Sequence, residues 1–142
     1  MDNQKVLDKF KRILKSENLK VTPQRLSILK EAVMPKGHRD IEQIMHDLID
    51  SGIKVSRATL YRTLDILHTN GFIRKMNIGD GADRYETKID SPHHDHMICI
   101  ETGKIIEFTS DKIESIQEKI AKDNGYKIVK HIHQLFVKPI NK

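Results

Sequence analysis

Hydrophobic residues in the first half of the chain recur every three or four positions, the spacing that places them on one side of a helix. Thr22-Pro23 and Ser56 are typical of helix starts, while Ser51-Gly52 and Gly71 are typical of helix ends. The pattern predicts helices along four stripes: Val6, Leu7, Phe10, Ile13 and Leu14; Leu26, Leu29 and Val33; Ile41, Ile44, Met45 and Leu48; and Leu60, Leu64 and Leu67. We expect the fourth helix over residues 56–70.

Two short segments after the fourth helix are typical of a β-hairpin. Residues 72–78 and 83–87 are rich in strand-forming side chains, and the turn residues Gly79-Asp80-Gly81 lie between them. Several helices followed by a basic hairpin is the order of elements in a winged helix. The sequence therefore predicts an N-terminal winged-helix DNA-binding domain over residues 1–87.

The pattern changes at residues 88–92, where Asp90-Ser91-Pro92 indicates a hinge. Two strands, an amphipathic helix and a long last strand with apolar residues on both faces are expected, in this order, at His94–Glu101, Lys104–Phe108, Asp111–Asn124 and Tyr126–Lys138. Residues 93–142 are thus predicted to form a small α/β domain, which makes the whole chain α+β. The edge strands of so small a sheet would expose unpaired backbone N–H and C=O groups. We therefore expect this domain to form a homodimer, which can cover those edges.

Charge is distributed unevenly between the two halves of the chain. Residues 1–85 hold 16 Lys and Arg against 11 Asp and Glu, whereas residues 86–142 hold 9 of each sign. Five of the eight histidines lie in this neutral half. A basic half and a histidine-rich half indicate two different tasks, one of them suited to an acidic partner such as nucleic acid.

Membrane and secretion signals are not visible in the sequence. No stretch approaches the roughly 20 apolar residues that span a bilayer. The N-terminal residues Met-Asp-Asn-Gln-Lys are not followed by the apolar segment of a signal peptide. The single cysteine, Cys99, has no partner for an intramolecular disulfide. We expect a cytoplasmic protein without a membrane partner.

The fourth predicted helix has the composition of a helix that reads DNA. Such a helix needs an apolar side for its own domain and a side with arginine, tyrosine and short polar residues for phosphates and bases. The residues that meet this need are Ser56, Arg57, Thr59, Tyr61 and Arg62, joined by Arg74, Lys75 and Arg84 from the hairpin. The alternative interpretation is an ordinary solvated helix with surface charge.

The strongest chemical signal is the segment His93-His94-Asp95-His96. Because successive side chains of a strand point to opposite faces, His94 and His96 share one face while His93 and Asp95 share the other. Neither pair suffices for a first-row divalent ion, which takes at least four ligands. The candidates for the missing ligands are Glu86, Glu107, Glu114 and His131, each of which taken alone is more typical of a solvent-facing residue. Three histidines on an apolar strand would nevertheless be costly without something to bind.

These residues, in this order and spacing, resemble the ferric uptake regulator (Fur) family from about Asn18 to Val137. The matching segments are Val21–Arg25, Ser56–Leu64, Gly79–Gly81, Arg84–Glu86, His93–Cys99, Gly103–Phe108 and His131. The resemblance implies a metal-responsive transcription regulator that represses iron-uptake genes. It implies a homodimer that binds double-stranded operator DNA when loaded with metal, takes no small-molecule substrate and is not an enzyme.

The resemblance also implies two metal sites. The regulatory site, which joins the two domains, corresponds to His38, Glu86, His94, His96 and Glu107. The second site, within the dimerisation domain, corresponds to His93, Asp95, Glu114 and His131. Metal in the regulatory site would favour the arrangement of the two domains in which the dimer binds DNA.

One part of the family pattern is missing. Many members hold a structural zinc ion with two Cys-x-x-Cys pairs, whereas here Cys99 stands alone and Thr102 occupies the second position. We therefore expect no cysteine-ligated zinc. The imidazole and carboxylate ligands suit Fe(II), Mn(II), Co(II) or Zn(II). The resemblance favours Fe(II) in the cell. It also favours iron sensing over peroxide sensing, because peroxide-sensing relatives tend to have aspartate where this chain has Glu86 or Glu107.

Other functions compatible with the pattern stay open at this point. A manganese- or peroxide-responsive regulator of the same family has the same kinds of ligand. A small metallohydrolase would use a metal-bound water as its nucleophile, but the sequence indicates neither a substrate pocket nor a general base. A purely structural metal domain is the third alternative.

Overall fold

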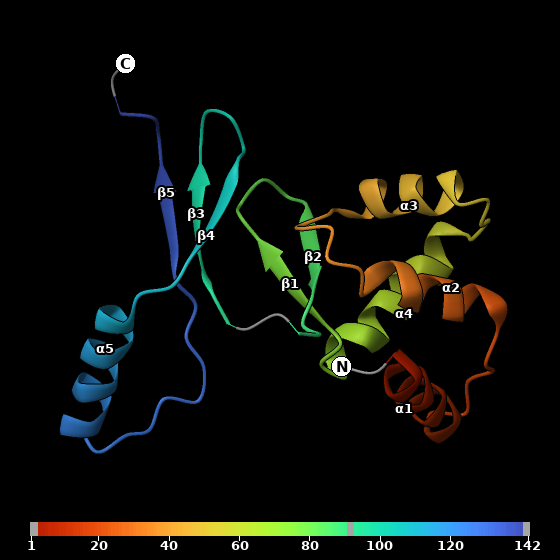
Figure 1. The fold of residues 1–142 in the computed structure, drawn as a ribbon, viewed down its shortest axis with the longest axis horizontal. Coiled ribbons are helices and arrows are strands. Elements are labelled where there is room, and N and C mark those ends of the chain that lie inside the picture. The colour runs from red at the N-terminus through yellow and green to blue at the C-terminus, as the bar shows by residue number, and fades with distance from the viewer. Residues whose placement is uncertain (1–2, 91–92, 141–142) are drawn as a thin grey trace. The chain divides into compact units, whose positions relative to one another are not determined.

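A computed structural model of the chain describes residues 3–90 and 93–140, and Figure 1 shows its helices and strands. The chain divides into two compact units, residues 1–92 and residues 93–142, each with its own sheet. The first unit contains α1 (Asn3–Ser16), α2 (Pro23–Ala32), α3 (Ile41–Asp50), α4 (Arg57–Thr69), β1 (Ile73–Asn77) and β2 (Asp83–Thr87). The second unit contains β3 (Asp95–Cys99), β4 (Ile105–Phe108), α5 (Asp111–Asp123) and β5 (Gln134–Val137). This order confirms the predicted α+β class. Within the described residues no helix has the length and hydrophobicity that crossing a bilayer requires.

Side chains cap the starts of α2 and α3. Thr22 accepts a hydrogen bond from the N–H of Arg25 at 3.2 Å. Asp40 and Gln43 form a capping box, in which each side chain accepts from the other residue's backbone N–H at 2.9 and 2.8 Å. These bonds satisfy backbone donors that have no partner inside a helix. α2 therefore begins at the predicted position, and the loop between α2 and α3 carries His38.

The fourth helix has the predicted limits and a fully buried inner side. Ser56 caps its start by accepting from the N–H of Thr59 at 3.1 Å, and Gly71 follows its end with a φ of +81°, which glycine adopts without strain. Leu60, Thr63, Leu64 and Leu67 have no exposed surface, and the three leucines belong to a core shared with α1, α2 and α3. Burial of each leucine stabilises the unit by about 1.5–3 kcal/mol. This packing fixes which side of α4 faces outward.

The predicted hairpin follows α4 and is held to the helices by a backbone bridge. β1 and β2 pair antiparallel, with Arg74 opposite Glu86. Arg39, in the loop between α2 and α3, exchanges two backbone hydrogen bonds with Tyr85, at 3.0 and 2.8 Å. This bridge adds a short third segment beside β2. It brings the residue before Arg39, which is His38, next to the residue after Tyr85, which is Glu86.

Part of the predicted hinge, residues 88–92, is attached to the first unit. The backbone N–H of Lys88 donates to the carbonyl of Phe72 at 3.0 Å. Ser91 and Pro92, which carried the prediction of a hinge, lie outside the described residues. Lys88 therefore continues the first unit beyond β2.

The described part of the second unit is built on a three-stranded sheet with β3 in the middle. β4 pairs with β3 antiparallel, which places Glu107 opposite His96. β5 pairs with β3 in parallel, which places Gln134 on the other side of His96. α5 lies between β4 and β5 in the sequence and is capped by Ser110, whose hydroxyl accepts from the N–H of Ile113 at 3.4 Å. The histidine-rich segment thus leads into the central strand.

The last strand is shorter than the predicted segment Tyr126–Lys138. β5 covers only Gln134–Val137, and residues 126–133 form no strand. The prediction was wrong because apolar residues on both faces make a strand only where a neighbouring strand supplies hydrogen bonds, and β3 begins at Asp95. The residues before β5 form a loop that brings His131 to Asp95.

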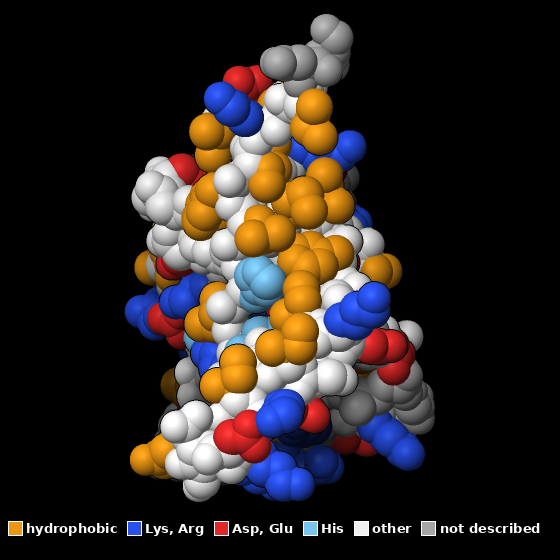
Figure 2. Space-filling model, turned by 90° about the vertical axis from the view of Figure 1, so that its left-hand side faces the viewer, with side chains coloured by type: hydrophobic (Ala, Val, Ile, Leu, Met, Phe, Trp, Pro, Cys, Tyr) orange, Lys and Arg blue, Asp and Glu red, His pale blue; other side chains and the backbone are white. Residues whose placement is uncertain are grey.

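The second unit exposes many large hydrophobic side chains. α5 has no buried residue, and its Ile116 and Ile120 are 61% and 59% exposed. The others are Ile100, Ile106, Tyr126, Val129, Ile132, Leu135, Phe136 and Ile140. Figure 2 shows hydrophobic side chains gathered on the surface of this unit. Large exposed hydrophobic patches are uncommon on monomeric soluble proteins and mark interaction surfaces.

Candidate metal centres and nucleic-acid interface

Four predicted ligands of the second unit converge on one point. Asp95 comes from β3, Glu114 from the first turn of α5, and His93 and His131 from the segments before β3 and β5. The Nε2 atom of His131 lies 2.8 Å from Asp95 Oδ1 and 3.5 Å from Glu114 Oε1. The Nε2 atom of His93 lies 3.3 Å from the same Asp95 oxygen and 3.0 Å from Nε2 of His131. One ligand atom from each of the four residues lies within 4.8 Å of all the others. We call this group the Asp95 cluster.

Asp95 is the most buried member of the cluster, with only 1% of its side chain exposed. Burial raises the pKa of its carboxyl, but the hydrogen bond from His131 and the nearby imidazoles lower it by more, so that the pKa lies below its ordinary value. Its second oxygen, Oδ2, is buried without a hydrogen-bond partner among the described residues. A buried carboxylate with an unused oxygen is costly unless a positive group binds it.

Two residues that were not predicted complete the surroundings of the Asp95 cluster. The side-chain amide of Gln117 lies 2.8 Å from Nδ1 of His131, which orients the ring so that Nε2 faces the cluster. His133 places its Nδ1 3.9 Å from the unused Oδ2 of Asp95, and its ring packs edge-on against Phe108. The spacing of His131 and His133, two residues apart in an extended segment, is the signal that could have indicated this second histidine.

The donor set of the Asp95 cluster fits a first-row divalent metal. It combines two imidazoles with two carboxylates and includes no thiolate. The separations of about 3 Å between its ligand atoms are those expected around an ion with bonds of about 2.0–2.2 Å. The unused oxygen of Asp95 is a further donor for such an ion. The cluster can therefore hold Fe(II), Mn(II), Co(II) or Zn(II).

A separate set of predicted ligands, His94, His96 and Glu107, lies elsewhere in the second unit. His96 and Glu107 are register partners on β3 and β4, so their side chains leave the sheet on the same face. The Nε2 atom of His94 lies 3.3 Å from Glu107 Oε1, and the rings of His94 and His96 meet edge-on with centroids 4.9 Å apart. Alternate residues of the histidine-rich segment thus belong to two different groups.

His38 and Glu86 meet in the first unit. The Nε2 atom of His38 lies 3.3 Å from Glu86 Oε2, and each side chain is only 8% exposed. Arg74, predicted as a DNA contact, turns its guanidinium toward the other oxygen of Glu86, at 3.4 Å. An imidazole and a carboxylate are therefore ready as ligands on this unit, with an arginine beside them.

The outward side of α4 presents the predicted DNA contacts. Ser56, Arg57, Tyr61 and Arg62 are exposed, and Thr59 is half-buried. The guanidinium of Arg57 pairs with the carboxylate of Glu42 on α3, so it has to leave that carboxylate before it can bind a phosphate. Lys75 on β1 is also exposed and lies 3.9 Å from the carboxylate of Asp83. The surface is basic and polar, as contact with a nucleic-acid backbone requires.

A cleft beside the start of α4 contains basic residues that were not predicted as contacts. Lys20, Arg25 and Lys54 line it, together with the capping residues Thr22 and Ser56. The cleft therefore lies at the starts of α2 and α4, where backbone N–H groups carry a partial positive charge. Only packing of the two helices brings these residues together, although the segment from Val21 to Arg25 had indicated a helix start.

Comparison with known proteins relates this arrangement to one family. The model of the ferric uptake regulator family matches residues 16–136. A ferric uptake regulation protein from Campylobacter jejuni subsp. jejuni is 38% identical over 133 residues, which cover 92% of this chain and 84% of that protein. The solved structure of the Helicobacter pylori regulator Fur, a protein with three functional metal-binding sites, matches 98% of this chain and 92% of that one, with a TM-score of 0.88 and 29% identity. The Pseudomonas aeruginosa ferric uptake regulator with manganese matches 90% of this chain and 96% of that one, with a TM-score of 0.78 and 32% identity. The chain belongs to the ferric uptake regulator family.

Proposed function

We propose that this protein is an Fe(II)-responsive repressor of iron-uptake genes, which acts in the cytoplasm and binds operator DNA as a metal-loaded homodimer. Members of its family are metal-responsive transcription regulators and not enzymes. The observation that carries the proposal is the presence of imidazole and carboxylate ligands on both units of a chain whose α4 presents a basic, polar surface.

The regulatory site in this proposal takes ligands from both units. His38 and Glu86 contribute from the first unit, and His94, His96 and Glu107 contribute from the second. A bound divalent ion supplies the positive charge that these ligands share. Binding one ion with both sets restricts the two units to one relative position. If DNA binds best in that position, metal occupancy raises the affinity for DNA by the same factor by which DNA raises the affinity for metal.

The first unit binds DNA through α4 in this proposal. Tyr61, 43% exposed, is available for a base, while Arg62 and Ser56 are available for phosphates. The cleft with Lys20 and Lys54 adds positive charge at the starts of two helices. Backbone contacts of this kind make binding weaken steeply as the salt concentration rises.

The second unit forms the dimer in this proposal. Phe136 is 54% exposed and Val129 is 98% exposed, in a unit whose helix α5 buries none of its residues. Pairing with a second copy would remove such side chains from water, at about 25 cal/mol for each Å² of apolar surface covered. The outer edges of β4 and β5 would also gain a cover.

Iron is the metal that the ferric uptake relatives favour, and the ligands are compatible with it. Ferric uptake regulators match most of the chain, one of them seen with manganese, and a zinc-bound manganese uptake regulator matches 92% of it as well. Both groups of ligands lack thiolate, which suits Fe(II) and Mn(II). The Asp95 cluster would serve as a second site, within the dimerising unit.

The test is an anaerobic DNA-binding titration of the full chain with Fe(II), Mn(II) and Zn(II), with the metal content measured in the same samples. The probe is a duplex selected from random-sequence DNA by metal-loaded protein. We expect Fe(II) to raise the affinity and a chelator to remove the gain. An affinity that is indifferent to the chelator contradicts the proposal, and a response to Mn(II) without one to Fe(II) identifies a manganese regulator instead.

A further inference from the structure

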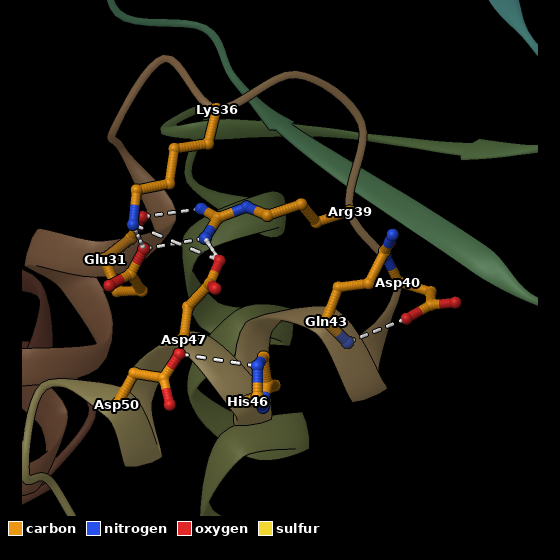
Figure 3. A network of polar contacts seen from close by, with 8 residues as sticks. All are labelled: Glu31, Lys36, Arg39, Asp40, Gln43, His46, Asp47 and Asp50. Carbon is orange, nitrogen blue, oxygen red and sulfur yellow. Dashed lines mark hydrogen bonds and ion pairs between the residues drawn. The ribbon is translucent and has the colours of Figure 1, made fainter.

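The loop between α2 and α3 is anchored by a partly buried group of charged side chains, none of which is a predicted metal ligand. Figure 3 shows this Arg39 network, which consists of Arg39, Glu31, Asp47 and Lys36. Arg39 Nη1 lies 2.6 Å from Glu31 Oε2 and 2.7 Å from Asp47 Oδ2, and its Nη2 donates to the backbone carbonyl of Glu31 at 2.7 Å. Lys36 Nζ lies 2.9 Å from the same Glu31 oxygen. The side chains of Arg39 and Glu31 are only 8% and 5% exposed.

The network ties one residue of the loop to two helices. Glu31 is on α2, Asp47 is on α3, and Arg39 is in the loop that connects these helices. Both helices pack against α4, which presents the predicted DNA contacts. The position of Arg39 is therefore set by the same helices that hold α4 in place.

The backbone of Arg39 places His38 beside Glu86. Arg39 and Tyr85 exchange both of their backbone hydrogen bonds, at 3.0 and 2.8 Å. In an antiparallel pair of this kind, the residue before one partner lies opposite the residue after the other. His38 is consequently held opposite Glu86, with Nε2 3.3 Å from Oε2. The Arg39–Tyr85 bridge is thus held at both ends. The side chain of Arg39 bonds it to α2 and α3, and Tyr85 belongs to β2.

Stability alone does not account for this choice of residues. A well-packed hydrophobic side chain often stabilises a core as much as a buried ion pair does, since charged groups lose their hydration on burial. The Nε atom of Arg39 is in addition buried without a hydrogen-bond partner in the described part of the chain. The charged groups instead fix the orientation of the Arg39 side chain, because a guanidinium bonded to two helices can occupy only one orientation.

We propose that the Arg39 network positions the metal ligand His38, holding its imidazole toward Glu86 before metal binds and linking it to the helices that support α4. Arg39 is a positioning residue and touches no metal. This inference rests on the proposed function, because it assumes that His38 and Glu86 belong to a metal site. Outer partners that orient ligands typically change metal affinity by about 10- to 100-fold when they are replaced.

The experiment is a Co(II) titration of the metal-free full chain, followed by calorimetry and by the visible absorption of bound cobalt. The variants are Arg39→Met, the milder Asp47→Asn and the double variant Arg39→Met with His38→Ala. Arg12→Met, an exposed arginine on α1 outside the network, is the control. The Asp95 cluster, in the other unit, serves as an internal reference in every titration.

We expect Arg39→Met to lower the cobalt affinity of the regulatory site by about tenfold or more and to alter its absorption, with the Asp95 cluster unaffected. Asp47→Asn should have a smaller effect of the same kind. Adding Arg39→Met to His38→Ala should cost no further affinity, because both changes act through one imidazole.

The outcomes separate this inference from the proposal on which it rests. The inference that the Arg39 network positions His38 is overturned if the cobalt affinity of the regulatory site is unchanged in both Arg39→Met and Asp47→Asn. It is also overturned if the regulatory site and the Asp95 cluster lose affinity equally, because that would show a general loss of structure. Wild-type protein that binds cobalt only at the Asp95 cluster refutes the proposed regulatory site itself.

Discussion

Replacement of Glu31 by glutamine isolates the charge at the centre of the Arg39 network. The Glu31 carboxylate is almost fully buried and lies 2.6 Å from Arg39 Nη1 and 2.9 Å from Lys36 Nζ. Glutamine has nearly the same shape and keeps one acceptor oxygen, so the packing of α2 stays as it is. The variant removes the negative charge and little else.

The expected cost follows from what Arg39 retains. Removing one partner of a buried ion pair costs about 3–5 kcal/mol when the other charge is left alone. In Glu31→Gln, Arg39 keeps the Asp47 carboxylate at 2.7 Å and the backbone carbonyl of residue 31 at 2.7 Å. Hydrogen bonds to charged groups contribute about 1.5–3 kcal/mol. We therefore expect the free energy of unfolding at neutral pH to fall by about 2 kcal/mol.

The effect should depend on pH in one direction. Burial raises the pKa of Glu31, but the hydrogen bonds from Arg39 and Lys36 and their charges lower it by more, so the folded-state pKa lies below the ordinary value. The carboxylate therefore stabilises the fold fully above the unfolded-state pKa, and this stabilisation is lost as the pH falls through the folded-state pKa. The difference between wild type and Glu31→Gln should narrow in that acid range.

Urea unfolding of the two metal-free proteins, followed by far-UV circular dichroism across neutral and acid pH, measures this difference. Equal stability at neutral pH would refute the reasoning, as would a difference that stays constant through the acid range. The first result would mean that the Glu31 charge contributes no net stability, and the second that ionisation of Glu31 is not the source of the difference.

Three further variants test the proposed function. His96→Ala should abolish metal-dependent operator binding while the fold and the Asp95 cluster remain, which circular dichroism and metal analysis verify; undiminished repression by this variant would exclude His96 from the regulatory site. Tyr61→Ala should weaken operator binding by about tenfold in a gel-shift titration with no change in metal affinity; equal operator affinity would remove Tyr61 from the DNA contacts. Phe136→Glu should convert the dimer to monomer in analytical ultracentrifugation, because it places a charge among exposed hydrophobic side chains of the second unit; a dimer of wild-type strength would locate the interface elsewhere.

Patterns between residues close in the sequence were sufficient for the helices of the first unit. Thr22 and Ser56 cap α2 and α4, and Gly71 ends α4, because these interactions reach only three or four residues along the chain. The same holds for the histidine-rich segment, where the alternation of a strand separates His94 and His96 from His93 and Asp95. The predicted ligands are consequently found in two groups within the second unit and as a pair in the first.

Local patterns were insufficient wherever a distant segment decides the outcome. Tyr126–Lys138 has the composition of a long strand, but β3 offers pairing only to Gln134–Val137. Glu31 has the character of an ordinary exposed residue near a helix end, yet packing buries it with Arg39. The approach of His133 to Asp95 likewise depends on the path of a loop.

Residue types and their spacing were therefore enough to predict the kinds and limits of most elements, and the kinds of metal ligand that this protein carries. Packing between distant segments, in contrast, buries the arginine that anchors the loop of His38, brings His133 to Asp95 and leaves particular hydrophobic side chains exposed. The difference lies in the range of the interactions. Caps and side-chain periodicity depend on neighbours within one or two turns, whereas strand partners, buried charges and ligand groups depend on packing between segments that are far apart along the chain.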